Sequence, residues 1–305
     1  MDGDGCLLYL CTVEKNKQNR LYMETVKLRN GVEMPVLGYG VFQVSPSECE
    51  RCVTDAISVS YRLIDTAQAY GNEEGVGNAI RKCGVPRGEL FIVTKVWISN
   101  AGYERAKASI DESLCKLQTD YIDLLLIHQP FGDYYGTYRA MEEAYKAGKL
   151  RAIGVSNFYP DRFIDLAEFS EIPPMVNQVE THVFNQQVEA QKIMQEYGTH
   201  IMAWGPFAEG RNNFFSNPTL SSIGTKYNKS VAQTALRYLI QRGVIVIPKS
   251  VRKERMEQNI DVFDFALTAD DIQEISLLDM KRSLFFSHYD PQTVKMLVNM
   301  GKGSR

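Results

Sequence analysis

Four ionisable side chains lie at or near the ends of apolar, strand-like runs, and their types could together move a proton. Asp65 closes the run in RLIDTA, Lys95 lies in FIVTKV, and His128 closes LLLIH. Tyr70 follows Asp65 by five residues, in the loop before a helix-like segment. Carboxylate, ammonium, imidazole and phenol side chains are the usual parts of general acid–base sites, so this set is a candidate reaction centre.

The position of Lys95 is the most informative of the four. Alternation along FIVTKV turns its ammonium inward among apolar neighbours, where a lysine is costly unless it is paired. Asp65 on the adjacent strand is an available partner. We expect the ammonium to lower the pKa of Tyr70 toward the range where a phenol donates a proton near neutrality. Hydride addition to a carbonyl requires an acid that gives a proton to the carbonyl oxygen. His128 would orient that oxygen.

Each of these residues also has an ordinary structural interpretation. A single strand-end Asp or His is usually a satisfied structural group, and a loop tyrosine usually packs. Four such residues on three consecutive strand–helix units make the functional interpretation stronger, because independent structural roles would have to coincide.

The elements that must position these residues alternate along the chain. Strand-like runs cover residues 35–40, 62–67, 90–96, 121–128, 151–157, 175–180, 200–206 and 243–250. Helix-like segments cover residues 47–60, 72–82, 104–117, 137–147, 160–169, 186–197, 230–241 and 252–262. Eight repeats without a Pro/Gly/Ser-rich linker predict an α/β protein with one closed (β/α)8 TIM barrel, whose catalytic groups collect at the carboxyl ends of the strands. A doubly wound open sheet is the alternative, but GYGVFQ fits its glycine-rich first turn poorly.

The ends of the chain lie outside this alternation. Residues 1–22 are polar and aperiodic and predict a flexible extension, so the barrel domain is expected over residues 23–305. Asn30-Gly31 between alternating residues predicts an N-terminal β-hairpin. The segment SLFFSHYDP is expected to form a C-terminal substrate loop.

Bulk properties narrow the function classes. The 305 residues carry a net charge of −3 with no clustered basic face, which argues against nucleic-acid and membrane-surface partners. No apolar run approaches the roughly 18 residues of a membrane span. The six cysteines lack a secreted framework spacing, so we expect a cytoplasmic protein. We further expect a monomer without a metal. Cys49 and Cys52 form a CxxC, but they lie along a helix pattern instead of opening it, which disfavours a redox pair.

The motifs DTAQAYGNE, TKVW, DLLLIH, GVSNF, NQVE and IPKSVRKERMEQN together resemble those of aldo-keto reductases, over residues 24 to 295. The likeness is to bacterial and protozoan members, near diketogluconate reductases and prostaglandin F synthases. The resemblance implies NADPH-dependent reduction of a small carbonyl compound. It also implies a catalytic tetrad of Asp65, Tyr70, Lys95 and His128, with Tyr70 as the general acid.

The resemblance further assigns the cofactor contacts. It implies that the carboxamide of the nicotinamide is bound by Ser156, Asn157 and Gln178. It implies that Trp204 stacks on the nicotinamide, where the family usually has tyrosine. It assigns the 2′-phosphate to Lys249, Ser250 and Arg255, and an adenine contact to Asn259. Positively charged side chains at the start of a helix are well placed to bind an anion, because the helix dipole and the free N–H groups there also favour one.

The resemblance and the loops after the strands indicate which side chains surround the substrate. Phe42, Trp97, Phe131 and the reactive His128 are expected to line the substrate site, and Gln129 stands where animal members have tryptophan.

Three other functions compete with carbonyl reduction. Lys95 could be the Schiff-base nucleophile of a barrel aldolase, although GVSNF and IPKS would then be unexplained. The barrel could bind its cofactor in a non-catalytic or regulatory role, which the intact tetrad disfavours. A glycosidase using Asp65 and Glu180 is weaker, since Lys95 would neutralise one carboxylate.

Overall fold

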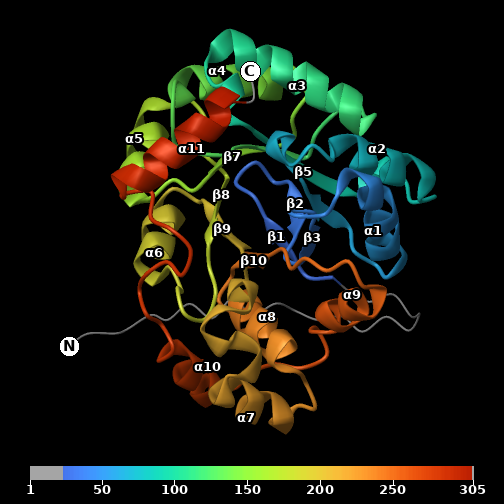
Figure 1. Ribbon diagram of the computed structural model, residues 1–305, viewed down its shortest axis with the longest axis vertical. Coiled ribbons are helices and arrows are strands. Elements are labelled where there is room, and N and C mark those ends of the chain that lie inside the picture. The colour runs from blue at the N-terminus through green and yellow to red at the C-terminus, as the bar shows by residue number, and fades with distance from the viewer. Residues whose placement is uncertain (1–22, 304–305) are drawn as a thin grey trace.

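The computed structural model describes residues 23–303, so the predicted flexible extension over residues 1–22 lies outside the described residues. A ring of helices surrounds a central set of strands, and a short hairpin lies in the middle of the view in Figure 1. This arrangement is the predicted barrel.

The hairpin joins β1 (Thr25–Lys27) to β2 (Glu33–Pro35) in antiparallel register. Its turn depends on Gly31, which has a φ of 86° and donates to the carbonyl of Leu28 at 2.8 Å. Leu28 and Met34 are fully buried against apolar side chains that begin the barrel strands, such as Leu63. The predicted hairpin is therefore confirmed, and it closes the barrel at the end opposite the carboxyl ends of the strands.

The barrel is one parallel sheet that contains all eight predicted strands. The strands are β3 (Gly38–Gly40), β4 (Leu63–Asp65), β5 (Phe91–Val96), β6 (Leu124–Ile127), β7 (Ile153–Ser156), β8 (Val176–Glu180), β9 (His200–Trp204) and β10 (Ile245–Val246). Their spatial order follows their order in the chain, and a parallel bridge between Leu37 and Val246 joins the first strand to the last. This closure brings all eight carboxyl ends to one rim.

Helices cover the outside of the strands. The helices that correspond to predicted segments are α1 (Pro46–Ser58), α2 (Glu73–Lys82), α3 (Tyr103–Leu117), α4 (Tyr134–Lys146), α5 (Pro160–Phe169), α6 (Val188–Glu196), α8 (Val231–Gln241) and α9 (Lys253–Ile260). Each presents an apolar stripe to the sheet, and these stripes form one continuous core with the outward-facing strand residues. The main differences from prediction are at helix ends, which fray and cap.

Three further helices were not predicted. They are α7 (Pro218–Lys226), α10 (Ala269–Ser276) and α11 (Pro291–Gly303). The last of these packs on the short helix η3 (Ile98–Asn100), where a Cβ on Gly301 would lie 2.9 Å from Ile98. Residues 277–290, between α10 and α11, contain no helix or strand and include the predicted C-terminal loop.

The CxxC cysteines lie inside α1 and not at its start. Cys49 and Cys52 are fully buried free thiols on the inner face of the helix. Burial raises the pKa of Cys49 to about 12, which suppresses the reactive thiolate. Their burial agrees with the structural interpretation of this motif.

Candidate active site

The predicted ion pair is present at the centre of the rim. Lys95 is fully buried, and its Nζ donates to Asp65 Oδ1 at 2.7 Å and to the Thr66 carbonyl at 2.8 Å. Its third contact is the hydroxyl of Tyr70, at 3.4 Å. One ammonium therefore joins the carboxylate at the end of β4 to the phenol of the following loop.

Tyr70 is placed by a short helix, η1 (Gln68–Tyr70), that is tied to the neighbouring unit of the barrel. The Gln68 side chain accepts from the Trp97 backbone N–H at 3.0 Å and from Asn100 Nδ2 at 2.9 Å. Phe42 packs on the Tyr70 ring with centroids 5.1 Å apart. These contacts hold the phenol above Lys95.

The direction of the Tyr70 pKa differs from the prediction. Burial raises this pKa by more than the Lys95 ammonium lowers it, so the overall shift is upward. The prediction that the cation would lower the pKa overall is wrong, because it counted the charge and not the loss of water around the phenol. A raised pKa keeps Tyr70 protonated near neutral pH, which is the state that a proton donor needs.

Lys95 stays charged in this setting. Burial alone lowers the pKa of Lys95, but Asp65 and Tyr70 together raise it above the usual value. A protonated amine has no lone pair with which to attack a carbonyl carbon. This argues against the Schiff-base role that the sequence left open.

His128 lies on the other side of the phenol. Its ring is 5.6 Å from the Tyr70 ring and 5.0 Å from the Trp97 ring, centroid to centroid. Burial, with a smaller contribution from Lys95, lowers its pKa well below the usual value. The imidazole is therefore neutral, and it can donate an N–H to an uncharged carbonyl oxygen.

The predicted carboxamide residues form one hydrogen-bond network at the ends of β7 and β8. Ser156 Oγ donates to the Gln178 carbonyl at 2.8 Å. Asn157 Nδ2 donates to Ser156 Oγ at 3.1 Å and to the His128 carbonyl at 3.0 Å. The indole N–H of Trp204 donates to Asn157 Oδ1 at 2.9 Å. The structure thus brings together the four residues that the sequence assigned to the nicotinamide.

This network also reaches the tetrad through a contact that sequence reasoning missed. Gln178 Nε2 donates to Asp65 Oδ2 at 2.8 Å, across the barrel interior. β8 and β4 are not neighbours in the sheet, so adjacency of strands gave no signal for this contact.

The predicted phosphate residues lie at the start of α9. Lys249 and Arg255 are exposed, whereas Ser250 and Asn259 are buried. Ser250 Oγ accepts from the Arg252 N–H at 3.1 Å, which shapes the turn into the helix. Within residues 23–303, no carboxylate lies within 4.0 Å of either Lys249 or Arg255. Unpaired cations at a helix start fit an anionic group such as a nucleotide phosphate.

The predicted substrate residues divide into two groups. Phe42 and Trp97 contact the Tyr70 and His128 rings, beside the tetrad. Phe131 has no ring contact with the tetrad among the described residues, and it stacks on His288 with centroids 5.8 Å apart. It therefore belongs to a neighbouring part of the rim.

The C-terminal loop is fastened to the barrel by residues that the sequence did not single out. Glu180 at the end of β8 accepts from the Leu284 N–H at 2.9 Å and from the Ser283 hydroxyl. His182 Nδ1 accepts from the Phe184 N–H, so its Nε2 carries the proton that is given to Glu180 at 2.9 Å. The Phe285 ring lies 5.2 Å from the Trp204 ring. Because Glu180 anchors this loop, the glycosidase role considered for it is disfavoured.

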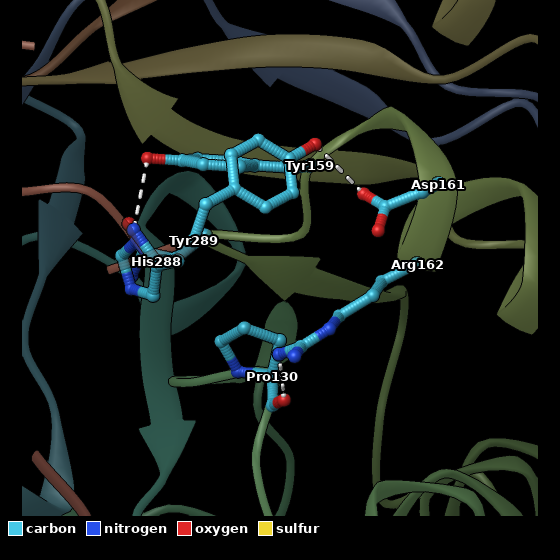
Figure 2. Close-up of a pocket in the computed structure, with 7 residues that line it drawn as sticks. Pro130, Tyr159, Asp161, Arg162, His288 and Tyr289 are labelled. Atoms are coloured by element: carbon cyan, nitrogen blue, oxygen red, sulfur yellow. Dashed lines mark hydrogen bonds between the residues drawn. The ribbon is translucent and has the colours of Figure 1, made fainter. Parts of the chain in front are cut away.

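Beside Phe131 the structure has a small pocket that is open to solvent. It is lined by Pro130, Asn157, Tyr159, Asp161, Arg162, His288 and Tyr289. Figure 2 shows the two tyrosines on one side of it and Arg162 on the other. Asn157 belongs both to this pocket and to the network below the tetrad, so the pocket adjoins the candidate reaction centre.

Comparison with known proteins identifies the family. The model of the Aldo/keto reductase family matches residues 36–279. The glyoxal reductase of Bacillus subtilis strain 168 is 48% identical over 258 residues, which cover 84% of this chain and 93% of that protein. This chain belongs to the aldo/keto reductase family.

A protozoan relative supports the predicted position within the family, and a relative of known structure supports the fold. The 9,11-endoperoxide prostaglandin H2 reductase of Trypanosoma cruzi is 43% identical over 257 residues, or 83% of this chain and 91% of that protein. An aldo-keto reductase of Bombyx mori, solved in complex with NADP, has a TM-score of 0.84 at 35% identity, covering 90% of this chain and 98% of its own. The resemblance to bacterial and protozoan aldo-keto reductases is confirmed.

Family membership makes this aldo-keto reductase an oxidoreductase with the barrel of its relatives. Over residues 23–303, no helix is long and apolar enough to cross a membrane. The same residues contain no group of three or more His, Cys, Asp or Glu side chains that could hold a metal ion.

Proposed function

We propose that the protein reduces aldehydes and ketones to alcohols with NADPH, and that Tyr70 is the general acid. The observation that carries this proposal is the buried Lys95 ammonium, which contacts both the Asp65 carboxylate and the Tyr70 hydroxyl. A charged group in that position stabilises the phenolate that forms as the proton leaves.

The chain's own groups account for the proton and for orientation. The neutral His128 imidazole donates to the carbonyl oxygen of the substrate and holds it beside the Tyr70 hydroxyl. As negative charge develops on that oxygen, Tyr70 passes its proton to it, and Lys95 faces the phenolate left behind. Phe42 and Trp97 provide an apolar wall that keeps water from the oxygen.

NADPH, when bound, supplies the hydride. Ser156, Asn157, Gln178 and Trp204 would hold its nicotinamide, since they form a polar, buried set beside one flat aromatic face. Lys249, Ser250 and Arg255 would hold the 2′-phosphate, with Asn259 at the adenine. A dianionic phosphate makes charge-assisted hydrogen bonds that NADH cannot offer, which supports a preference for NADPH.

The experiment is the oxidation of NADPH by the purified protein with a panel of aldehydes and ketones. We expect saturable, substrate-dependent loss of NADPH absorbance, and the alcohol as product. Cofactor binding without turnover of any member of the panel would instead favour the non-catalytic role. A borohydride-trapped adduct on Lys95 would favour the aldolase.

A further inference from the structure

Arg162 has an unusual environment for a surface arginine. It lies in the first turn of α5, where the helix dipole disfavours a cation. Within residues 23–303, no carboxylate oxygen lies within 4.0 Å of its guanidinium. Neither the helix dipole nor an ion pair therefore accounts for the position of this side chain.

The guanidinium is nevertheless held in place. Nη1 donates to the Pro130 carbonyl at 2.7 Å, and Cζ lies 5.3 Å from the centroid of the Phe131 ring. The Nε and Nη2 donors have no acceptor among the described residues. The hydrogen bond and the aromatic contact hold the guanidinium in one position, and its other N–H donors remain free. Such a group can bind an oxyanion without first losing conformational freedom.

Other unsatisfied polar groups meet at the same pocket. The N-cap residue of α5, Tyr159, makes no side-chain cap, and the backbone N–H groups of Asp161 and Arg162 have no acceptor within the described part of the chain. Across the pocket, His288 is 5% exposed and its buried Nδ1 has no hydrogen-bond partner. The N–H groups at the start of α5 are suited to an anion. His288 Nε2 donates to Gln129 Oε1 at 2.7 Å, so its buried Nδ1 is an acceptor, suited to a hydroxyl or water beside that anion.

The charges of the other side chains around the pocket determine whether it suits an anion or a cation. His288 is uncharged near neutrality, because burial, helped by Arg162, lowers its pKa to about 4. Asp161 also lines the pocket, but its carboxylate accepts from the Tyr289 hydroxyl at 3.0 Å. Figure 2 shows that carboxylate turned toward Tyr289, while the Arg162 side chain extends toward Pro130. The end of the pocket beside Pro130 is therefore cationic.

The pocket is too small for a whole substrate, so only the end of a substrate could lie against Arg162 at its mouth. Pro130 follows the proposed reactive His128 by two residues, and Asn157 lines the pocket while it donates to the His128 carbonyl. A substrate with its carbonyl oxygen at Tyr70 can therefore extend its other end along this rim.

We propose that this pocket is a subsite for the carboxylate of carbonyl substrates and that Arg162 is the residue that selects it. The proposal rests on the proposed carbonyl reductase function and adds a substrate class to it. Acidic aldehydes and ketones should be preferred over neutral ones of the same shape.

The test compares matched substrates with NADPH: meta- and para-carboxybenzaldehyde, and their neutral carbamoyl analogues. For at least one isomer we expect the acid to exceed the amide in kcat/KM by about tenfold, equivalent to about 1.4 kcal/mol. Arg162→Gln should abolish this preference and leave turnover of the amide within about twofold of wild type. Arg162→Lys should retain part of the preference, because it keeps the positive charge but loses the paired N–H donors of the guanidinium that can bind both carboxylate oxygens.

Two further variants sharpen the result. Arg211→Gln removes another cation near the rim, one that stacks on Phe285 at 4.4 Å and does not line the pocket, so it should leave the preference unchanged. Asp161→Asn removes the competing negative charge and should increase the preference for the acid. Equal rates for acid and amide in the wild type with both isomers, or a preference that survives Arg162→Gln, overturns the subsite. Absence of turnover with every aldehyde contradicts the proposed function itself.

Discussion

Replacing Asp65 with asparagine tests the ion pair on which the proposed chemistry depends. The side chains have the same shape, and an asparagine oxygen can still accept the bond from Gln178. What changes is the charge beside the fully buried Lys95 ammonium, which would keep only the Thr66 carbonyl and the Tyr70 hydroxyl. Burial, which already lowers the pKa of Lys95, would then be unopposed by a carboxylate.

The magnitude follows from the geometry. At an effective dielectric constant of about 20, opposite charges at the observed 2.7 Å attract by about 6 kcal/mol. Removing one partner of a buried ion pair lowers the free energy of unfolding by about 3–5 kcal/mol, because the other charge stays buried without a partner. In the variant the unfolded chain binds the Lys95 proton more tightly than the folded one. Its stability should therefore fall as pH falls below the unfolded lysine pKa, by up to about 1.4 kcal/mol per pH unit, until the depressed folded pKa is reached.

The assay is urea unfolding of wild type and Asp65→Asn at pH values from about 6 to 9, with the activity profile alongside. The loss of stability should be largest at the acidic end and should shrink as pH rises. The activity profile should shift toward alkaline pH, because without the ammonium the pKa of Tyr70 rises further.

Asp123→Asn is the matched control. Asp123 is fully buried at the amino end of β6 and pairs with Arg87 at 2.7 Å and Arg151 at 2.6 Å. Arginines do not deprotonate in this range, so its destabilisation should be the same at each pH. If Asp65→Asn shows the same flat dependence, or no loss at all, the reasoning about Lys95 is wrong.

Three other substitutions probe the remaining parts of the site. Tyr70→Phe should reduce turnover by about 10²–10⁴-fold, the usual contribution of a general acid, and leave NADPH affinity nearly intact in a fluorescence titration; near-wild-type turnover excludes Tyr70 from the mechanism. Trp204→Phe keeps a flat ring but removes the N–H that holds Asn157, so NADP affinity should weaken by about fivefold, the effect of one neutral hydrogen bond; unchanged affinity means that this bond orients nothing. Arg255→Ala should raise the KM for NADPH by at least about tenfold and leave that for NADH almost unchanged, as expected for a lost phosphate contact; equal losses place the phosphate elsewhere.

The sequence was sufficient for the barrel because its signals are local and repeated. Runs such as FIVTKV and LLLIH are mostly apolar, as expected of buried parallel strands, and all eight predicted strands are present. Carboxyl ends of such strands share one rim, so the approach of Lys95 to Asp65 followed from the fold class and from the cost of a buried lysine.

The missed helices had weaker signals. α10 begins with a capping box between Thr268 and Asp271, which was visible as T-x-x-D before the spaced apolar residues Ile272 and Ile275. However, this helix follows the last strand and lies outside the eight repeats. α7 is an extra helix between β9 and α8, with Asn217 as its cap. An interpretation based on the repeat assigns one helix to each strand and leaves such insertions out.

The pKa of Tyr70 could not be obtained from the sequence, because two large opposing effects act on it. Spacing indicated the nearby cation, but the extent to which Phe42, Trp97 and His128 exclude water is a property of the folded rim. Burial prevails, and the sign of the shift reverses.

The bond from Gln178 to Asp65 shows what closure of the barrel adds to the neighbour relations of its strands. It joins the tetrad to the residues proposed to hold the nicotinamide, since Ser156 donates to the backbone carbonyl of the same Gln178. Asn157 extends the same network to the backbone of His128. A ligand that moves the Gln178 side chain would therefore act on the carboxylate that holds Lys95, and through Lys95 on the proton donor. The proposed cofactor site and the proposed acid are thus linked by a continuous set of hydrogen bonds, so binding of the cofactor should alter the pKa of Tyr70.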